Sequence, residues 1–522
     1  MKSISRRHFH RRVGEGMLIT TLGTSLASEL GVASSIAEEL TDTAITFGDL
    51  EPIVALMEET PVDQVQKVAV GKLKSGEESL HSLMRAAALS NARRFGGMDY
   101  IGMHTLMAMK PAYLMAQQLP EDRAALAVLK ILHRNTGQIQ SGECRGEVMN
   151  SINPAKLPGD ASTADLLNKA VRQKDRKRAE EILSASAGTS AEQAFNDLLD
   201  TVEEGAQVHN VVFAHRAWEA LDLVGEEHAL TMLRQSLRYR AGFEGNEWTK
   251  PGPKRVLLPK ILDEFQLTGF TPGSKSISDE RMWELSKTIF SSTPEESARA
   301  VAAELKDGVS PAAIGEAISL AANQLVLRDV GRIKPVKNNP DKEAGSIHGD
   351  SIGVHASDSA NAWRKMAGVA ADRHTIACLI LGAYQATYDR INRGGDFLDW
   401  EPRPHAEELA SVKADDPAKL LSELDGVIRE EDQDRTCAVA RKYADIGGEV
   451  RPFLDLMLKY AVSEDGALHA EKYYLTTSTD FADTRPAYRW NHLIGLARET
   501  ASAYGLKAAG YQDACELLGV DA

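Results

Sequence analysis

The chain has 522 residues, enough for several average domains and for a large buried core. Apolar residues make up 43 % and charged residues 26 %, which is typical of a globular protein and excludes a chain disordered throughout. The formal net charge is −15, and no basic stretch outside the first twelve residues offsets it. This charge disfavours nucleic acid and anionic membrane surfaces as partners and favours small molecules or ions.

The N-terminus has the order Ser5-Arg6-Arg7-His8-Phe9, which resembles the twin-arginine export signal. A weakly apolar stretch follows from Met17 to Ala37 and ends in Ser35-Ile36-Ala37, with small residues where a signal peptidase reads. Glu29 interrupts this stretch, which argues against a membrane-spanning helix and against stable membrane insertion. We therefore predict a twin-arginine signal peptide over residues 1–37, the twin-arginine translocase as a partner during export, and a periplasmic or extracellular mature chain. The alternative is an ordinary basic tail.

Beyond residue 50 the apolar residues follow helical periodicity nearly everywhere, which predicts an all-α fold. Two helix starts are clearly marked, at Thr60-Pro61 and at Thr293-Pro294, where a capping hydroxyl precedes a proline. A carboxylate follows each proline within the first turn, at Asp63 and Glu296, where it favours the helix dipole. The segment GFEGNEWTKPGPKRVLLPK is rich in glycine and proline and is predicted as a loop.

Two long stretches of the chain can be aligned with each other, and this predicts an internal duplication. TPVDQVQKVAVGKLKSGEE parallels TPEESARAVAAELKDGVSP, and the two copies then share asparagine, Asp-Arg and histidine matches in the same order. We expect two similar halves, over residues 50–245 and 280–510, joined by a linker over residues 246–279 and packed as a helical bundle or toroid. A polar insertion, RIKPVKNNPDKEAGSIHGD, precedes the first matched histidine of the second half.

Three histidine pairs recur in both copies: His104 with His355, His209 with His469, and His228 with His492. Neutral imidazole is the commonest transition-metal ligand and titrates near neutrality, so recurrent histidines on apolar helices suit metal binding or proton transfer. The ordinary alternative is a set of buried histidines with satisfied hydrogen bonds. No HExxH, ExxH or DxD motif names a particular metal, and no nucleotide-binding fingerprint is present.

The order of these histidine segments resembles the questin oxidase-like family of helical proteins, whose motifs have the form HxLTAAHAL, GALHPLIHLGYGLE, HLLHGVTAAHAL and EHVIKLVYAL. The corresponding segments here are MHTLMAMKPAYLMA, GAQVHNVVFAHRAWEALD, VHASDSANAWRKMA and DGALHAEKYYL. The chain departs from the family in two ways. His209 and His215 are six residues apart instead of four, and the first and third motifs lack their second histidine. The resemblance implies oxidative chemistry on a cyclic or aromatic substrate.

The leading hypothesis is an exported oxidoreductase in which four histidines converge between the two halves and bind a metal or line a substrate cavity: His104, His209, His355 and His469. Iron, copper and zinc are the metals considered, and no cofactor is named by the sequence. Three further histidines are candidate catalytic residues, as proton carriers or outer ligands: His215, His228 and His492. His215 lies about 120° around the helix from His209 and is not expected to bind the same ion.

Two other classes of function fit the same residues. A helical-repeat protein could bind a ligand without chemistry, and its histidines would be dispersed through separate helix pairs. A metal-dependent hydrolase or lyase would use a metal-activated water. The hypothesis of one shared site predicts that at least three histidines surround one centre, with their outer nitrogens held by carboxylates or carbonyls. The candidates are His104, His209, His215, His228, His355, His374, His469 and His492.

Overall fold

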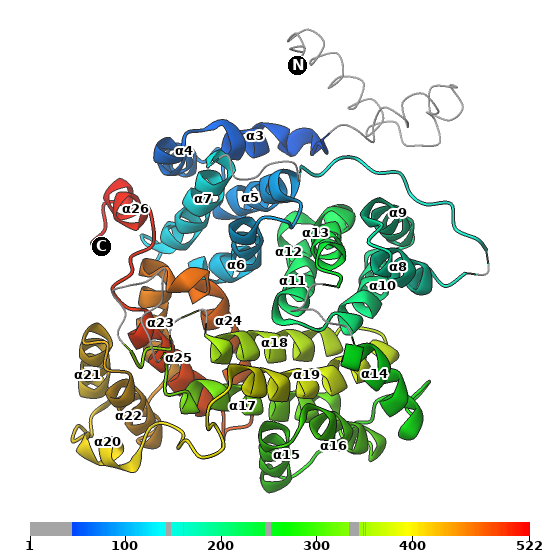
Figure 1. Ribbon diagram of the computed structural model, residues 1–522. Helices are drawn as coiled ribbons and strands as arrows, with labels where there is room; N and C mark the ends of the chain where they lie inside the picture. Colours follow the sequence, from blue (N-terminus) through cyan, green and yellow to red (C-terminus); the bar gives the residue numbers. More distant parts are fainter. Residues whose placement is uncertain are drawn as a thin grey trace.

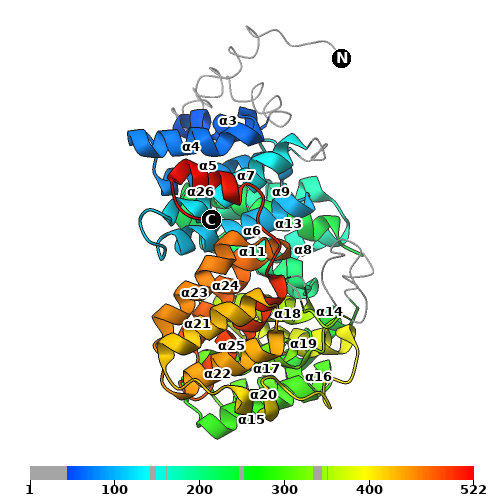
Figure 2. The same ribbon diagram turned by 90° about the vertical axis from the view of Figure 1, so that its left-hand side faces the viewer.

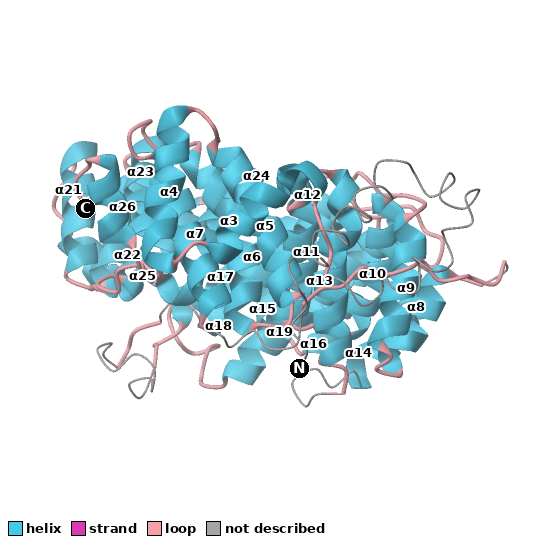
Figure 3. Ribbon diagram, turned by 90° about the horizontal axis from the view of Figure 1, so that it is seen from above, coloured by secondary structure: helices cyan, strands magenta, loops and turns pink. Residues whose placement is uncertain are grey.

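The structure is a computed structural model that describes residues 44–141, 148–159, 161–245, 252–332, 344–347, 349 and 351–522. Helices are its only extended regular elements within these ranges, and strand-like pairing is limited to isolated bridges such as Ala44 with Asn150 (Figure 3). The all-α prediction is therefore confirmed. The predicted signal peptide, residues 1–37, lies outside the described residues, as does most of the polar insertion before His355.

The first predicted half is a succession of helices, most of them joined by short connections. They are η1 (Gly48–Leu50), α3 (Glu51–Glu59), α4 (Val62–Ser75), α5 (Leu80–Phe95), α6 (Tyr100–Ala116), α7 (Ala124–Gln140), α8 (Thr163–Arg172), α9 (Arg176–Ala187), α10 (Ala191–Glu204), α11 (Val208–Glu219), α12 (Leu221–Val224), η2 (Glu226–His228) and α13 (Ala229–Gly242).

The second predicted half begins after α14 (Gly252–Glu264) and ends before a last helix, α26 (Tyr511–Leu518). Its helices are α15 (Asp279–Ser291), α16 (Pro294–Lys306), α17 (Pro311–Arg328), α18 (Ile352–Ala367), α19 (Asp372–Arg393), α20 (Ala406–Ser411), α21 (Pro417–Arg429), α22 (Gln433–Asp445), α23 (Val450–Ser463), η4 (Gly466–Leu468), α24 (Ala470–Asp483) and α25 (Trp490–Ala503).

One of the two predicted helix starts is confirmed, and the other is formed differently. Thr293 caps α16 in a capping box, in which its hydroxyl accepts from the Glu296 backbone and the Glu296 carboxylate accepts from the Thr293 backbone. Thr60 does not cap α4, which begins at Val62. Instead the Gln140 side chain, at the end of α7, accepts from the Val62 N–H at 3.0 Å, so a distant amide takes the role predicted for the threonine.

The prediction of a loop over GFEGNEWTKPGPKRVLLPK is wrong in its second part, because α14 begins at Gly252. A proline near a helix start costs little, since that N–H has no partner within the helix. The four apolar residues Leu257, Leu258, Ile261 and Leu262 fall on one face of α14 and are buried. Burial of this apolar face stabilises the helix despite Pro259 in its interior.

The two halves pack against each other over a broad surface, with the first half above the second in Figure 2. Helices α6 and α11 of the first half contact α24 and α18 of the second half, and these four helices meet in the middle of the molecule (Figure 1). The last helix, α26, returns to the first half and packs on α4 and α7 (Figure 2). None of the described helices has the length and apolar character needed to cross a membrane.

Candidate functional site

Four histidines form a closed ring where α6, α11, α18 and α24 meet. Each imidazole contacts two others, and the ring centroids are 5.1 Å apart for His104 and His209, 5.3 Å for His209 and His355, 4.7 Å for His355 and His469, and 5.2 Å for His469 and His104. These are the four histidines that the sequence predicts to converge between the two halves. The structure brings them together from four different helices and from both halves of the chain.

In three of these histidines the Nδ1 atom, called the outer nitrogen here, contacts a polar group two to four residues earlier in the chain. The Nδ1 atom of His104 lies 2.8 Å from the Tyr100 carbonyl, and that of His469 lies 2.7 Å from the Ala467 carbonyl. The Nδ1 atom of His209 lies 3.2 Å from the side-chain amide nitrogen of Gln207. These contacts leave Nε2 as the remaining nitrogen of each ring, and the Nε2 atoms of His355 and His469 are 3.0 Å apart.

Two of these inner nitrogens are buried without a hydrogen-bond partner in the described part of the chain, namely the Nε2 atoms of His104 and His209. Buried polar atoms normally have a partner, since an unpaired one costs on the order of 1–3 kcal/mol. The two unpaired Nε2 atoms therefore leave room for a partner from outside the chain. Among the described residues, no three of the four histidines place one ligand atom each within 4.8 Å of one another, so an ion would have to draw the rings together.

Three of the four imidazoles have lowered pKa values, which favour the neutral form. Burial lowers the pKa of His209 to about 3, and it holds the pKa values of His104 and His469 well below the usual 6.5. The ammonium group of Lys472, which is 1 % exposed on α24, lowers all three pKa values further. Burial also lowers the pKa of Lys472 itself to about 7, against the opposing effect of Asp358. Sequence reasoning missed Lys472, although its position three residues after His469 places both on neighbouring turns of one helix.

A buried charge network fixes the start of α24 against the first half. The ammonium of Lys130, on α7, lies 2.9 Å from the Glu471 carboxylate and donates to the carbonyls of Ala461 and Glu464. Arg134, one turn along α7, reaches the same carboxylate at 3.3 Å. Both cations keep Glu471 ionised, so its pKa falls to about 2 although burial opposes this. The network thereby holds the turn that carries His469.

Aromatic side chains flank the ring on the side of the first half. Tyr100 is 56 % exposed, and its ring lies 4.3 Å from that of His104 and 6.1 Å from that of His209. Tyr239, on α13, is buried and lies 6.5 Å from His209. His104 and His469 are buried, whereas His209 and His355 are partly exposed, so the ring is nearest to solvent at these last two histidines.

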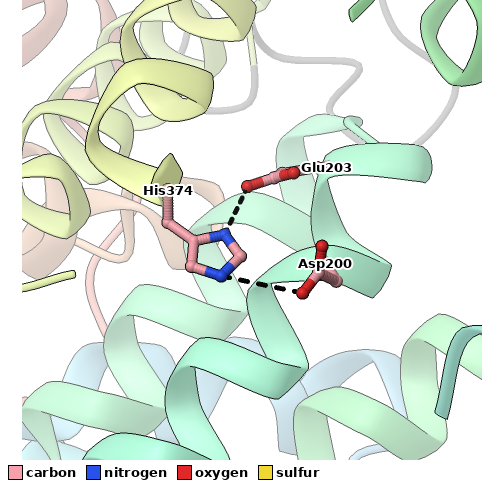
Figure 4. Close-up of side chains that lie close together, drawn as sticks. All are labelled: Asp200, Glu203 and His374. Carbon is pink, nitrogen blue, oxygen red and sulfur yellow. Dashed lines mark hydrogen bonds and ion pairs between the residues drawn. The ribbon is translucent and has the colours of Figure 1, made fainter. Parts of the chain in front are cut away.

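A second cluster lies between α10 and α19, where Asp200, Glu203 and His374 place one possible ligand atom each within 4.8 Å of one another (Figure 4). The Nδ1 atom of His374 is 2.7 Å from the Glu203 carboxylate, and its Nε2 atom is 3.6 Å from that of Asp200. The chemical types and spacing would allow this triad to hold a metal ion. His374 was one of the eight candidate histidines, but its partners come from the other half of the chain.

The triad already contains a permanent positive charge. Arg373 pairs with Glu203 and lies 3.6 Å from Asp200, so its guanidinium occupies the neighbourhood that a cation would neutralise. Burial and the Glu203 charge raise the pKa of Asp200 to about 6. This arrangement acts as an ion-pair network that joins the two halves, in contrast to the histidine ring, which contains no carboxylate.

The three histidines predicted as catalytic have partners of their own. The Nε2 atom of His215 is 3.6 Å from Glu219 on the same helix, and that of His492 is 3.3 Å from the Thr484 hydroxyl. His228 packs edge-on against Phe47. None of the three is in contact with the four rings among the described aromatic pairs, so their catalytic role stays a prediction.

A search of family models found no match to this chain, and searches of curated proteins and of solved structures found none either. The resemblance to the questin oxidase-like family therefore stays an interpretation of the sequence motifs.

Proposed function

We propose that the four-histidine ring binds one transition-metal ion, and that the protein is an exported oxidoreductase acting on a small cyclic or aromatic molecule. The observation that carries this proposal is the closed ring of four histidines, in which the Nε2 atoms of His104 and His209 have no partner among the described residues. Histidines that serve only as core residues would each pair with a local group and would have no reason to converge.

The outer contacts of the ring support metal binding. Histidines that bind metals usually donate their other N–H to a carbonyl or carboxylate, which fixes the orientation of the ring. His104 and His469 do this through the carbonyls of Tyr100 and Ala467. The Ala467 carbonyl is directed at its histidine by a left-handed backbone, with φ at 50° and ψ at 42°, which is uncommon for alanine. Strain of this kind is retained mainly at functional sites.

The ring offers imidazole nitrogens as its only ligand type. Such nitrogens would hold copper, iron, nickel or zinc, so the ligand type alone does not select one metal. The oxidoreductase is preferred over the hydrolase or lyase because the histidine segments resemble those of the questin oxidase-like family.

We further infer that the ring arose from the predicted duplication. Around the ring His104 is opposite His355 and His209 is opposite His469, which are the pairs aligned in the sequence. The helix contacts follow the same rule, since α6 with α24 and α11 with α18 are equivalent crossings between the halves. A two-fold arrangement of duplicated helices would produce both observations.

The test is metal analysis of the exported protein, purified without chelators, together with a variant that interrupts the ring. We expect about one copper, iron or nickel ion per chain, and we expect His104→Gln to lose at least nine-tenths of it. His405→Gln is the matched control, because it removes a histidine near the surface, on the N-terminal side of α20. Circular dichroism would confirm that both variants are folded.

Metal content below one-tenth of an ion per chain in the wild-type protein, also after reconstitution with these ions, would contradict the proposal. The redox assignment has a separate test, which is oxygen consumption with a panel of phenols and quinols. Turnover without oxygen consumption, by hydrolysis or elimination, would favour the hydrolase or lyase instead.

A further inference from the structure

The side chain of Gln207 determines which nitrogen of His209 carries the proton. Gln207 caps α11, and its oxygen accepts from the backbone N–H groups of His209 at 3.0 Å and of Asn210 at 3.4 Å. These two donors fix the orientation of the amide, because only its oxygen can accept. The amide nitrogen is therefore the atom that lies 3.2 Å from Nδ1 of His209.

An amide nitrogen can only donate, so Nδ1 of His209 must be the acceptor. A neutral imidazole with an accepting Nδ1 carries its proton on Nε2. That Nε2 atom is buried and has no partner in the described part of the chain, and so His209 presents an unpaired N–H donor.

His104 and His469 have the opposite tautomer. Each donates its Nδ1–H to a backbone carbonyl, that of Tyr100 for His104 and that of Ala467 for His469, so each keeps a lone pair on Nε2. The contrast is sharpest between His209 and His469, which the sequence aligns. The residue two positions before each histidine provides the contact, and it is a donor at Gln207 and an acceptor at Ala467.

We propose that His209 is not a metal ligand but a hydrogen-bond donor, whose Nε2–H binds an oxygen-containing ligand on an ion held by His104, His469 and His355. His355 donates its Nε2–H to His469 in the metal-free ring, so it becomes a ligand only when metal binding displaces that proton. A metal ligand must offer a lone pair, which His209 does not offer while Gln207 is bound to its Nδ1. The ligand class is a small molecule that binds through oxygen, such as water, dioxygen or a phenolate. This inference rests on the proposed function, and it leaves one coordination position open, as catalytic metal sites require.

The first experiment reads the tautomer without any metal. The metal-free full chain, labelled with ¹⁵N in its histidine rings, gives two-bond ¹⁵N–¹H correlations that distinguish a proton on Nδ1 from one on Nε2. The signals of His209 are those that disappear in His209→Gln. We expect Nε2–H at His209, and Nδ1–H at His104, which is assigned in the same way. A proton on Nδ1 of His209 would overturn the inference while leaving the proposed metal site intact.

The second experiment changes the tautomer and counts ligands. In Gln207→Glu the carboxylate can accept both the backbone N–H groups and an Nδ1–H, so the proton of His209 should move to Nδ1 and free Nε2. With Cu(II) added to the metal-free chain as a probe, pulsed electron paramagnetic resonance should detect three histidine nitrogens in the wild type and four in this variant. We expect Cu(II) to bind about ten-fold more tightly to the variant, which is the usual scale for an outer contact.

Gln64→Glu is the control, since it adds the same charge at an exposed position on α4 and should leave the ligand number and affinity unchanged. Four nitrogens in the wild type, unchanged by Gln207→Glu, would overturn the inference and support the proposed site as a symmetric one. Failure of Cu(II), Ni(II) and Fe(II) to bind the wild type would overturn the proposed function and the donor role with it, even where the tautomer is as expected.

Discussion

The buried imidazole of His215 should make the protein less stable as the pH falls through a defined range. Burial lowers the pKa of His215 from 6.5 to about 4, and the nearby Glu219 carboxylate only partly opposes this. Between these two values the unfolded chain binds a proton that the folded chain does not. The contribution to stability is therefore complete above about pH 6.5 and is lost as the pH falls toward 4.

The size of the loss follows from the two pKa values. Each pH unit within this range costs about 1.4 kcal/mol, so at pH 5 the loss from His215 alone is about 2 kcal/mol. Urea unfolding at pH 7.5 and at pH 5, with wild type and His215→Leu, would measure it. We expect the wild type to lose about 2 kcal/mol more than the variant, because all other titrating groups are shared. Equal losses in the two proteins would refute the reasoning.

Three further predictions concern the charge networks and the access to the ring. Lys130→Met should lower the free energy of unfolding by about 3–5 kcal/mol, measured in urea, because Glu471 loses a buried partner; a loss under 1 kcal/mol would contradict the network. Asp200→Asn should raise stability at pH 7, by on the order of 1 kcal/mol, since the raised pKa of Asp200 shows that its charged form is disfavoured in the folded state. That gain should shrink to nothing below pH 4, and loss of bound metal in this variant would show that the triad is a metal site after all. Tyr100→Ala should speed removal of the ring metal by a chelator several-fold, measured by stopped flow, because the exposed tyrosine covers His104; an unchanged rate would place the access route elsewhere.

The fold class could be predicted because helical periodicity is a local property of the sequence. The capping box at Thr293 is equally local, since Thr293 and Glu296 are three residues apart. The start of α4 could not be predicted in detail, because its first N–H is satisfied by Gln140, which is distant in sequence. The helix α14 was missed because its prolines and glycines outweighed four apolar residues that are buried only in the tertiary structure.

The four ring histidines could be selected from the sequence because they recur in the two aligned stretches. Their tautomers could not, since these depend on whether an amide or a carbonyl meets Nδ1. The role of Gln207 could be predicted only in part, because a polar residue just before the helix that carries His209 is recognisable as a possible cap. Lys130 gave no signal, because a lysine in an amphipathic helix is normally expected at the surface. The partners of His374 could not be predicted either, because they lie in the other half of the chain, as Glu471 does for Lys130.

The return of α26 to the first half bears on the order in which the molecule can mature during synthesis. Lys74 of α4 donates to the carbonyl of Leu517, and Gly510 leaves no room for a side chain beside His133 of α7. The residues that cover α4 and α7 are therefore synthesised after all the other described helices. Until then α4 and α7 keep an uncovered face, and His469 has only recently been made. A nascent chain would thus expose the uncovered face of α4 and α7 during most of its synthesis, which gives chaperones time to bind there before the interior is finished.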